Sequence, residues 1–141
     1  MNTIPFSIRP MVLVVDDVPD NLLVVSDLLR EAGYAVRAAT SGPVALRYAA
    51  QTPKPDVILL DVMMPGDLDG YQVCARVKAD TRLRGTRVVM LTARGQKSDL
   101  EAGAQAGADA YLTKPFSPLE LIDTVERLLE AEVDTLSQQA A

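Results

Sequence analysis

Three short apolar runs along the chain lack the alternation that a half-exposed strand would show. They cover residues 11–15, 56–60 and 87–91, and a polar residue follows each of them. Continuous apolar runs of this length are typical of strands buried on both faces, as in a parallel sheet. Two further strands are expected at residues 35–39 and 110–112, between stretches that have helical spacing.

Helical patterns separate these strands and follow the last one. The first helix is expected to begin near Pro19 and to end at Gly33, a residue suited to a left-handed cap. The last helix should begin after Ser117, because Pro118 and Glu120 complete a first-turn proline and a capping box. Strand and helix alternate five times, which predicts an α/β fold with a doubly wound parallel sheet. The other helices are expected at about residues 41–51, 71–77 and 96–106.

Polar residues with chemical potential come directly after the predicted strands. Asp16 and Asp17 follow the first, Asp61 the third, Thr92 the fourth and Lys114 the fifth. Ligands of parallel α/β sheets bind beyond the carboxyl ends of the strands, so these five side chains should converge at one edge. Taken alone, the two adjacent aspartates are equally typical of a turn before a helix. Their combination with the other residues favours a site.

Three neighbouring carboxylates raise one another's pKa, and a hard divalent cation is the usual compensation. The chain has no histidine, so a metal must be held by oxygen ligands, which favours Mg²⁺. A carboxylate beside that ion, facing a lysine and a hydroxyl, is suited to phosphoryl transfer, with Asp61 attacking and Lys114 offsetting charge. Thr92 could then bond a phosphoryl oxygen.

Composition narrows the classes of function. The chain has 141 residues, which fits one domain, and a formal net charge of -5, which disfavours direct binding to nucleic acid or anionic membranes. It shows no signal-peptide pattern and no apolar stretch of eighteen residues. Its single cysteine, Cys74, is expected to be a buried thiol, which suits a reducing, cytoplasmic setting.

Four motifs then resemble those of the receiver domains of two-component response regulators, in the same order. They are VVDD at residues 14–17, LLDVMMPG at 59–66, LTA at 91–93 and YLTKPF at 111–116. Each motif is weak alone, but together they form a specific set that covers roughly residues 11–129. The resemblance implies a flavodoxin-like receiver fold with strand order 2-1-3-4-5. It also implies a signalling phosphoacceptor rather than an enzyme.

The resemblance also implies roles for individual residues. Asp61 would accept the phosphoryl group, Asp17 would bind Mg²⁺ directly, and Asp16 would bind it through water. The backbone carbonyl of Met63 would complete the protein's share of the metal shell, and its thioether is not expected to be a ligand.

Switching would depend on residues of the last two strands. Thr92 would be the switch hydroxyl, Lys114 would be the ion partner of the phosphoryl group, and the ring of Tyr111 would rotate inward. Packing at a strand is the ordinary alternative for that tyrosine. The Lys114–Pro115 peptide bond would be cis. A sensor histidine kinase or phosphotransfer protein would be the phosphodonor, and an output partner or domain would be the target.

The expected domain organisation is an N-terminal extension at residues 1–10, a receiver domain at 11–131, and a tail or helix extension at 132–141. The loop at 65–70 looks one residue longer than is usual in the family. An apolar stripe, Ile122, Val125, Leu129, Val133 and Leu136, has coiled-coil spacing. Either the last helix extends and a second copy or a following segment covers it, giving a possible homodimer, or residues 132–141 fray.

Two other functions compete with this interpretation. A phosphatase of the haloacid dehalogenase type also uses an aspartate after a parallel strand, but it needs an acid two residues later. Val18 and Met63 occupy those positions here. The second alternative is an interaction module that keeps the fold without the chemistry, and the complete set of Asp61, Thr92 and Lys114 argues against it.

Overall fold

The computed structural model describes residues 9–64, 66, 68–93 and 97–140. Its centre is a parallel sheet with the strand order β2-β1-β3-β4-β5, which confirms the predicted topology. The continuous apolar runs explain this arrangement, since every residue of β1 and β3 is buried. The strands are β1 (Met11–Val15), β2 (Ala35–Ala39), β3 (Val57–Asp61), β4 (Arg87–Thr92) and β5 (Ala110–Thr113).

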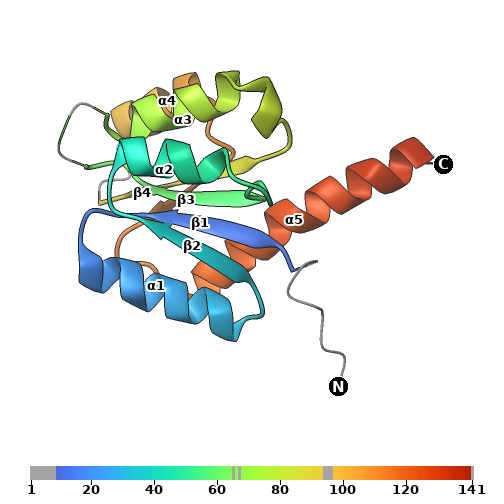
Figure 1. The fold of residues 1–141 in the computed structure, drawn as a ribbon, viewed down its shortest axis with the longest axis horizontal. Helices are drawn as coiled ribbons and strands as arrows, with labels where there is room; N and C mark the ends of the chain where they lie inside the picture. The colour runs from blue at the N-terminus through green and yellow to red at the C-terminus, as the bar shows by residue number, and fades with distance from the viewer. Residues whose placement is uncertain (1–8, 65, 67, 94–96, 141) are drawn as a thin grey trace.

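Helices cover both faces of the sheet, as the alternation of patterns predicts (Figure 1). Helices α1 and α5 pack on one face, where Leu29 and Leu121 are fully buried. Helices α2 and α3 cover the opposite face with residues such as Ala45 and Val73, and α4 lies beside α3. The helices are α1 (Pro19–Glu31), α2 (Gly42–Ala49), α3 (Gly70–Ala79), α4 (Lys97–Ala106) and α5 (Pro118–Ala140), with a 3₁₀ turn, η2 (Thr81–Leu83).

The predicted helix ends have the expected chemistry. Gly33 adopts a φ of 100° just after α1, the left-handed conformation that glycine tolerates best. At the start of α5, the Ser117 hydroxyl accepts the backbone N–H of Glu120 at 3.1 Å, and the Glu120 carboxylate accepts the backbone N–H of Ser117 at 3.5 Å. The capping box is therefore confirmed.

Three strands differ by one residue from their predicted bounds, since β4 and β5 end at Thr92 and Thr113, one residue later than expected, and β3 differs at both ends. The third strand begins at Val57 rather than at Asp56, and it ends with Asp61 instead of just before it. The side chain of Asp56 accepts the backbone N–H of Met11 at 2.8 Å, so this residue fixes the entry into the sheet. At the other end, the pairing of Asp61 with Leu91 keeps the acidic residue inside the ladder.

The two ends of the chain and one loop complete the description. Helix α5 projects from the body of the domain and runs to Ala140 (Figure 1). The predicted N-terminal extension lies mostly outside the described residues, and so do positions 65 and 67 of the loop expected to be longer than usual. Within the part of the chain that the structure describes, no helix has an apolar stretch sufficient to cross a bilayer.

Candidate functional site

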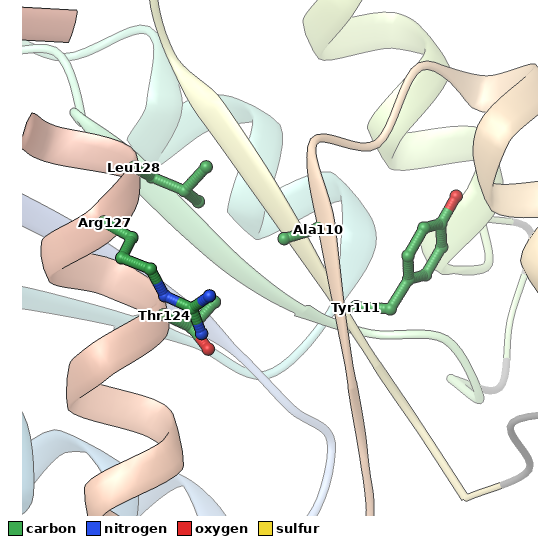
Figure 2. Close-up of a pocket in the computed structure, with 5 residues that line it drawn as sticks. All are labelled: Ala110, Tyr111, Thr124, Arg127 and Leu128. Atoms are coloured by element: carbon green, nitrogen blue, oxygen red, sulfur yellow. The ribbon is translucent and has the colours of Figure 1, made fainter. Parts of the chain in front are cut away.

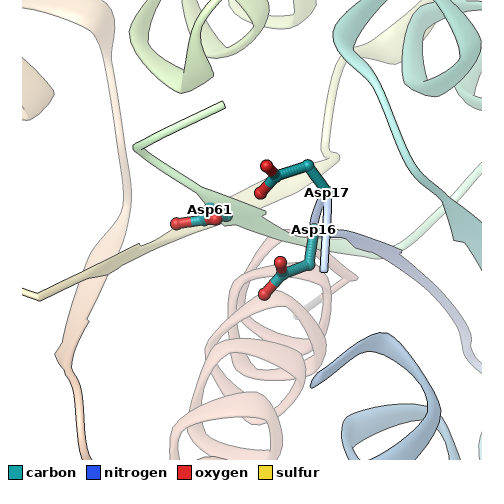
Figure 3. Close-up of side chains that lie close together, drawn as sticks. All are labelled: Asp16, Asp17 and Asp61. Carbon is teal, nitrogen blue, oxygen red and sulfur yellow. The ribbon is translucent and has the colours of Figure 1, made fainter. Parts of the chain in front are cut away.

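Three aspartates meet at the carboxyl edge of the sheet. Strands β1 and β3 are neighbours, and Val15 pairs with Leu60, so the residues that follow this pair lie side by side. Asp16, Asp17 and Asp61 each offer a carboxylate oxygen, and these atoms lie within 4.8 Å of one another. Figure 3 shows the three side chains gathered at the ends of the two strands. The sequence prediction that they converge is therefore correct.

Backbone contacts hold two of these carboxylates in place. The Asp16 side chain accepts the backbone N–H of Val18 at 2.9 Å, while its own N–H donates to the carbonyl of Ala39 at 3.1 Å. The Asp61 side chain accepts the backbone N–H of Met63 at 3.3 Å. Asp16 is 3% exposed and Asp61 is 6% exposed, so neither charge is well hydrated.

Lys114 brings a positive charge to the cluster from the end of β5. Its ammonium lies 3.4 Å from Oδ1 of Asp61 and 3.5 Å from Oδ2 of Asp16. The backbone N–H of Lys114 donates to the carbonyl of Thr92 at 2.7 Å, which joins the ends of β4 and β5. The peptide bond that follows, between Lys114 and Pro115, is cis, as the family resemblance implies.

The electrostatics of the cluster favour a bound cation. Burial is the largest cause that raises the pKa of Asp61; the Lys114 charge lowers this pKa, and the Asp16 charge raises it. Among the described residues, Lys114 pairs with two of the three carboxylates, Asp16 and Asp61, so one ammonium compensates the cluster only in part. Desolvated like charges of this kind need a counter-ion, and an all-oxygen ligand set suits Mg²⁺. The residues present therefore fit that metal.

Met63 lies beside this cluster, two residues after Asp61. Its side chain is 75% exposed, so the thioether points away from the core. Because its N–H already donates to Asp61, its backbone is close to the carboxylates. A metal-ligand role for the carbonyl of the same residue is implied by the family resemblance and stays a prediction.

The two candidate switch residues have different surroundings. Thr92 is the last residue of β4 and is 4% exposed, one position beyond the Leu91 that pairs with Asp61. Tyr111 lies in β5, and its hydroxyl donates to the carbonyl of Leu100 in α4 at 3.1 Å. Tyr111 therefore contacts α4 rather than the acidic cluster, and burial raises its pKa.

Alternation along β5 places Tyr111 on the face away from α5. Figure 2 shows Ala110 directed toward the α5 residues Thr124, Arg127 and Leu128, with Tyr111 pointing to the opposite side. These residues line a pocket of about 260 Å³. Tyr111 is one of the lining residues although its ring points to the other face of β5.

Gly70 is a site residue that the sequence pattern does not single out. It is the first residue of α3, and its N–H donates to the carbonyl of Val62 at 3.1 Å. A Cβ at this position would meet the carbonyl oxygen of Asp61 and would lie 2.7 Å from Cα of Val62. Only glycine lets α3 approach the aspartate so closely. A glycine before a helix is too common a signal to reveal this packing.

Comparisons with known proteins agree with this geometry. A family model described as the response regulator receiver domain matches residues 12–126. The DNA-binding dual master transcriptional regulator RpaA of Synechocystis is 42% identical over 131 residues, which are 93% of this chain and 53% of RpaA. The response regulator PleD of Caulobacter vibrioides is 40% identical, over 92% of this chain and 29% of PleD.

A solved structure gives the same result for the fold. The chemotaxis response regulator CheY4 of Vibrio cholerae superimposes with a TM-score of 0.80 at 34% identity, covering 85% of this chain and 98% of that one. By contrast, the chain spans about half of the length of RpaA and less of PleD. The match over most of the chain, together with the acidic cluster and its lysine, shows that this protein belongs to the response regulator receiver domain family.

Proposed function

We propose that this receiver domain is a phosphoacceptor switch in which Asp61 carries the phosphoryl group. One oxygen of the Asp61 carboxylate attacks phosphorus and forms a new P–O bond. The bond from phosphorus to the donor breaks, and the donor leaves with that electron pair. With a phosphohistidine donor, the departing imidazole nitrogen takes up a proton. The observation that carries this proposal is the buried Asp61 carboxylate beside both Asp16 and Lys114.

The same cluster would hold Mg²⁺. We assign Asp17 and Asp61 as direct ligands, Asp16 as a ligand through water, and the carbonyl of Met63 as the remaining protein ligand. When bound, Mg²⁺ would offset negative charge on the phosphoryl oxygens. The support is the proximity of the three carboxylates and the single ammonium, that of Lys114, that pairs with them among the described residues.

Lys114, Thr92 and Tyr111 would translate phosphorylation into a change of shape. Phosphorylation adds about -1.5 to -2 charge, so Lys114 pairs with the new group and the Thr92 hydroxyl donates a hydrogen bond to it. Movement of Thr92 then changes the space available to the ring of Tyr111. The support is the position of Thr92 at the end of β4, directly between the strands of Asp61 and Tyr111.

The partners follow from this role. A sensor histidine kinase or a phosphotransfer protein supplies the phosphoryl group, and an output domain or partner responds to it. We assign residues 11–131 to the receiver, with residues 132–141 as a helix extension that can pair in a homodimer. The net charge of -5 argues against direct contact with nucleic acid or a membrane surface. The unpaired, buried Cys74 suits a cytoplasmic location.

Mass spectrometry of the intact chain after incubation with acetyl phosphate tests the proposal. The parent should gain one phosphoryl group in Mg²⁺ and almost none in EDTA, and Asp61→Asn should gain none. The exposed Asp20→Asn of α1 is the matched control and should behave as the parent does. Uptake by Asp61→Asn equal to that of the parent would remove Asp61 from this role.

The two competing functions predict different results in the same assay. A phosphatase would release phosphate continuously from small phosphomonoesters, although Met63 stands where its general acid would be needed. A module without chemistry would take up no phosphate under any condition. A single stable phosphoryl adduct distinguishes the switch from both.

A further inference from the structure

Helix α4 is attached to the domain by unusually small side chains. Among residues 100–106, whose side chains the structure describes, Leu100 is 38% exposed and Gly103 is the buried position. Ala106 contacts the core only partly. Most helical stability in proteins comes from burial of an apolar face, and this stretch of α4 offers little. Contacts from other elements to this stretch of α4 therefore matter for its attachment.

Two side chains from neighbouring elements reach the backbone of α4. The thiol of Cys74 in α3 donates to the carbonyl of Ala106 at 3.5 Å, near the end of the helix. The hydroxyl of Tyr111 in β5 donates to the carbonyl of Leu100 at 3.1 Å, near its beginning. The ring of Tyr111 also packs against the cluster of core residues beneath α3 and α4. Tyr111 thus provides both a polar and an apolar contact to the first turns of α4.

The ring can occupy this place because residue 103 has no side chain. A Cβ on Gly103 would meet Cε1 of the Tyr111 ring, and it would lie 2.9 Å from the hydroxyl oxygen and 3.0 Å from Cζ. Contacts below 3.0 Å force one partner to move, and here the movable partner is the end of the tyrosine side chain. Figure 2 shows that the ring stands clear of α5, on the side of the strand where α4 lies.

We propose that Gly103 is a positioning residue for Tyr111: it keeps a gap in the helix surface that seats the ring against α4. With a larger residue at 103, the ring is displaced from this seat and the hydrogen bond to Leu100 is lost. The inference rests on the proposed function in one respect, namely that the Tyr111 ring changes place when Asp61 is phosphorylated. Gly103 then determines how strongly the unphosphorylated form holds the ring.

Glycine in a helix interior is otherwise unfavourable, because it loses the most backbone entropy on folding. Alanine at an unobstructed position would strengthen α4. Gly103→Ala should therefore stabilise the domain only where the Tyr111 ring does not occupy this space. The nearest atoms to such a Cβ belong to the end of the Tyr111 side chain, which can move, so Gly103→Ala should leave the domain folded.

A double-mutant cycle on thermal unfolding tests the contact. In a Tyr111→Ala background, Gly103→Ala should raise the melting temperature by roughly 2–4 °C, since the helix gains propensity without a clash. With Tyr111 present, the same substitution should give no increase or a decrease. Equal increases in both backgrounds would show that the ring and residue 103 do not interact, and would overturn the proposal.

A second measurement follows the ring itself. In protein labelled with 3-fluorotyrosine, the ¹⁹F signal of Tyr111 is identified by its loss in Tyr111→Phe. In Gly103→Ala this signal should move toward the value of an exposed tyrosine, and phosphorylation should then change it less than in the parent. Ala104→Gly, at an exposed position of α4, weakens the helix without approaching the ring and should leave the signal in place. An unchanged signal in Gly103→Ala would contradict the proposal.

A separate measurement tests the proposed phosphoacceptor role. Phosphate uptake by Gly103→Ala, measured by mass, should equal that of the parent because the substitution lies outside the acidic cluster. Absence of uptake in both proteins would refute the proposed function. The double-mutant cycle would still show whether Gly103 and Tyr111 interact in the unphosphorylated protein.

Discussion

The ammonium of Lys114 lies 3.4 Å from Oδ1 of Asp61 and 3.5 Å from Oδ2 of Asp16. One ammonium therefore lies within ion-pair distance of two buried carboxylates, one just after β1 and the other at the end of β3. Lys114→Met keeps most of the apolar stem and removes the charge. We expect phosphoryl uptake from acetyl phosphate to slow by at least about tenfold, equivalent to about 1.4 kcal/mol in the barrier.

The matched control is Lys54→Met, because the Lys54 ammonium bonds only the nearby carbonyl of Ala50 among its described contacts. Stopped-flow or quenched mass measurements at fixed Mg²⁺ give the two rates. If Lys114→Met and Lys54→Met reacted equally fast, Lys114 would have no part in phosphoryl transfer.

Repulsion among the three carboxylates should lower the free energy of unfolding of the metal-free protein. Asp61→Asn removes one of three neighbouring negative charges, so its melting temperature in EDTA should exceed that of the parent by roughly 2–4 °C, the effect of about 1 kcal/mol in a domain of this size. Added Mg²⁺ should raise the melting temperature of the parent more than that of the variant. Equal responses to Mg²⁺ would argue that Asp61 is not a ligand.

Thr92→Ala should separate phosphorylation from its structural consequence. The substitution leaves Asp61 and Lys114 in place, so phosphate uptake should stay within about twofold of the parent. Hydrogen exchange in α4, compared with and without the phosphoryl group, should change in the parent and much less in Thr92→Ala. A response of α4 as large as that of the parent would exclude Thr92 as the switch hydroxyl.

The sequence predicts the sheet well because its strands are simple. Unbroken apolar runs identify β1 and β3, whose residues are all buried, and helix patterns between them leave few topologies. The convergence of Asp16, Asp61 and Lys114 then follows from the rule that parallel strands end at one edge. These residues are far apart in the chain but occupy equivalent positions in repeated units.

Packing details could not be predicted in the same way. The contact of Gly103 with Tyr111 depends on the height of α4 above β5, which no residue pattern encodes. Asp109 is a second example. Its carboxylate bonds both the backbone N–H of Val88 and the ammonium of Lys78, which is 31 residues away in the chain. Such contacts become visible only when helices and strands are placed together.

Cys74 should react slowly with thiol reagents while the protein is folded. Burial, the largest cause, raises the pKa of this thiol from 9.0 to about 11, and its side chain has no exposed surface. At pH 8 only roughly one thiol in a thousand would be ionised. Labelling with a disulfide reagent should therefore be at least about 100-fold faster in denaturant than in buffer.

The same shift predicts a pH effect on stability. The folded state holds the Cys74 proton more tightly than the unfolded state does, so the free energy of unfolding should fall as pH rises from about 9 to about 11. Denaturant titrations of the parent and of Cys74→Ala across this range give the comparison. Parallel curves for the two proteins would show that the thiol does not contribute.

The C-terminal stripe predicts self-association. Helix α5 continues to Ala140, and after Leu129, which packs against the core, the sequence repeats apolar residues at 133 and 136. Light scattering should give about twice the monomer mass for the full chain at high concentration, and the monomer mass after truncation following Glu130. Both proteins should be measured with and without a phosphoryl mimic. Monomer masses in all four samples would dispose of the homodimer.

The length of α5 has a mechanical consequence. A helix of 23 residues is about 35 Å long, and its first part packs on the sheet while its last part projects from the domain. A tilt of only about 3° at its base moves the tip by about 2 Å, as large as the helix shifts that operate at subunit interfaces. Such a tilt would make the helix a lever, because a small displacement at its base would become a larger one at Ala140.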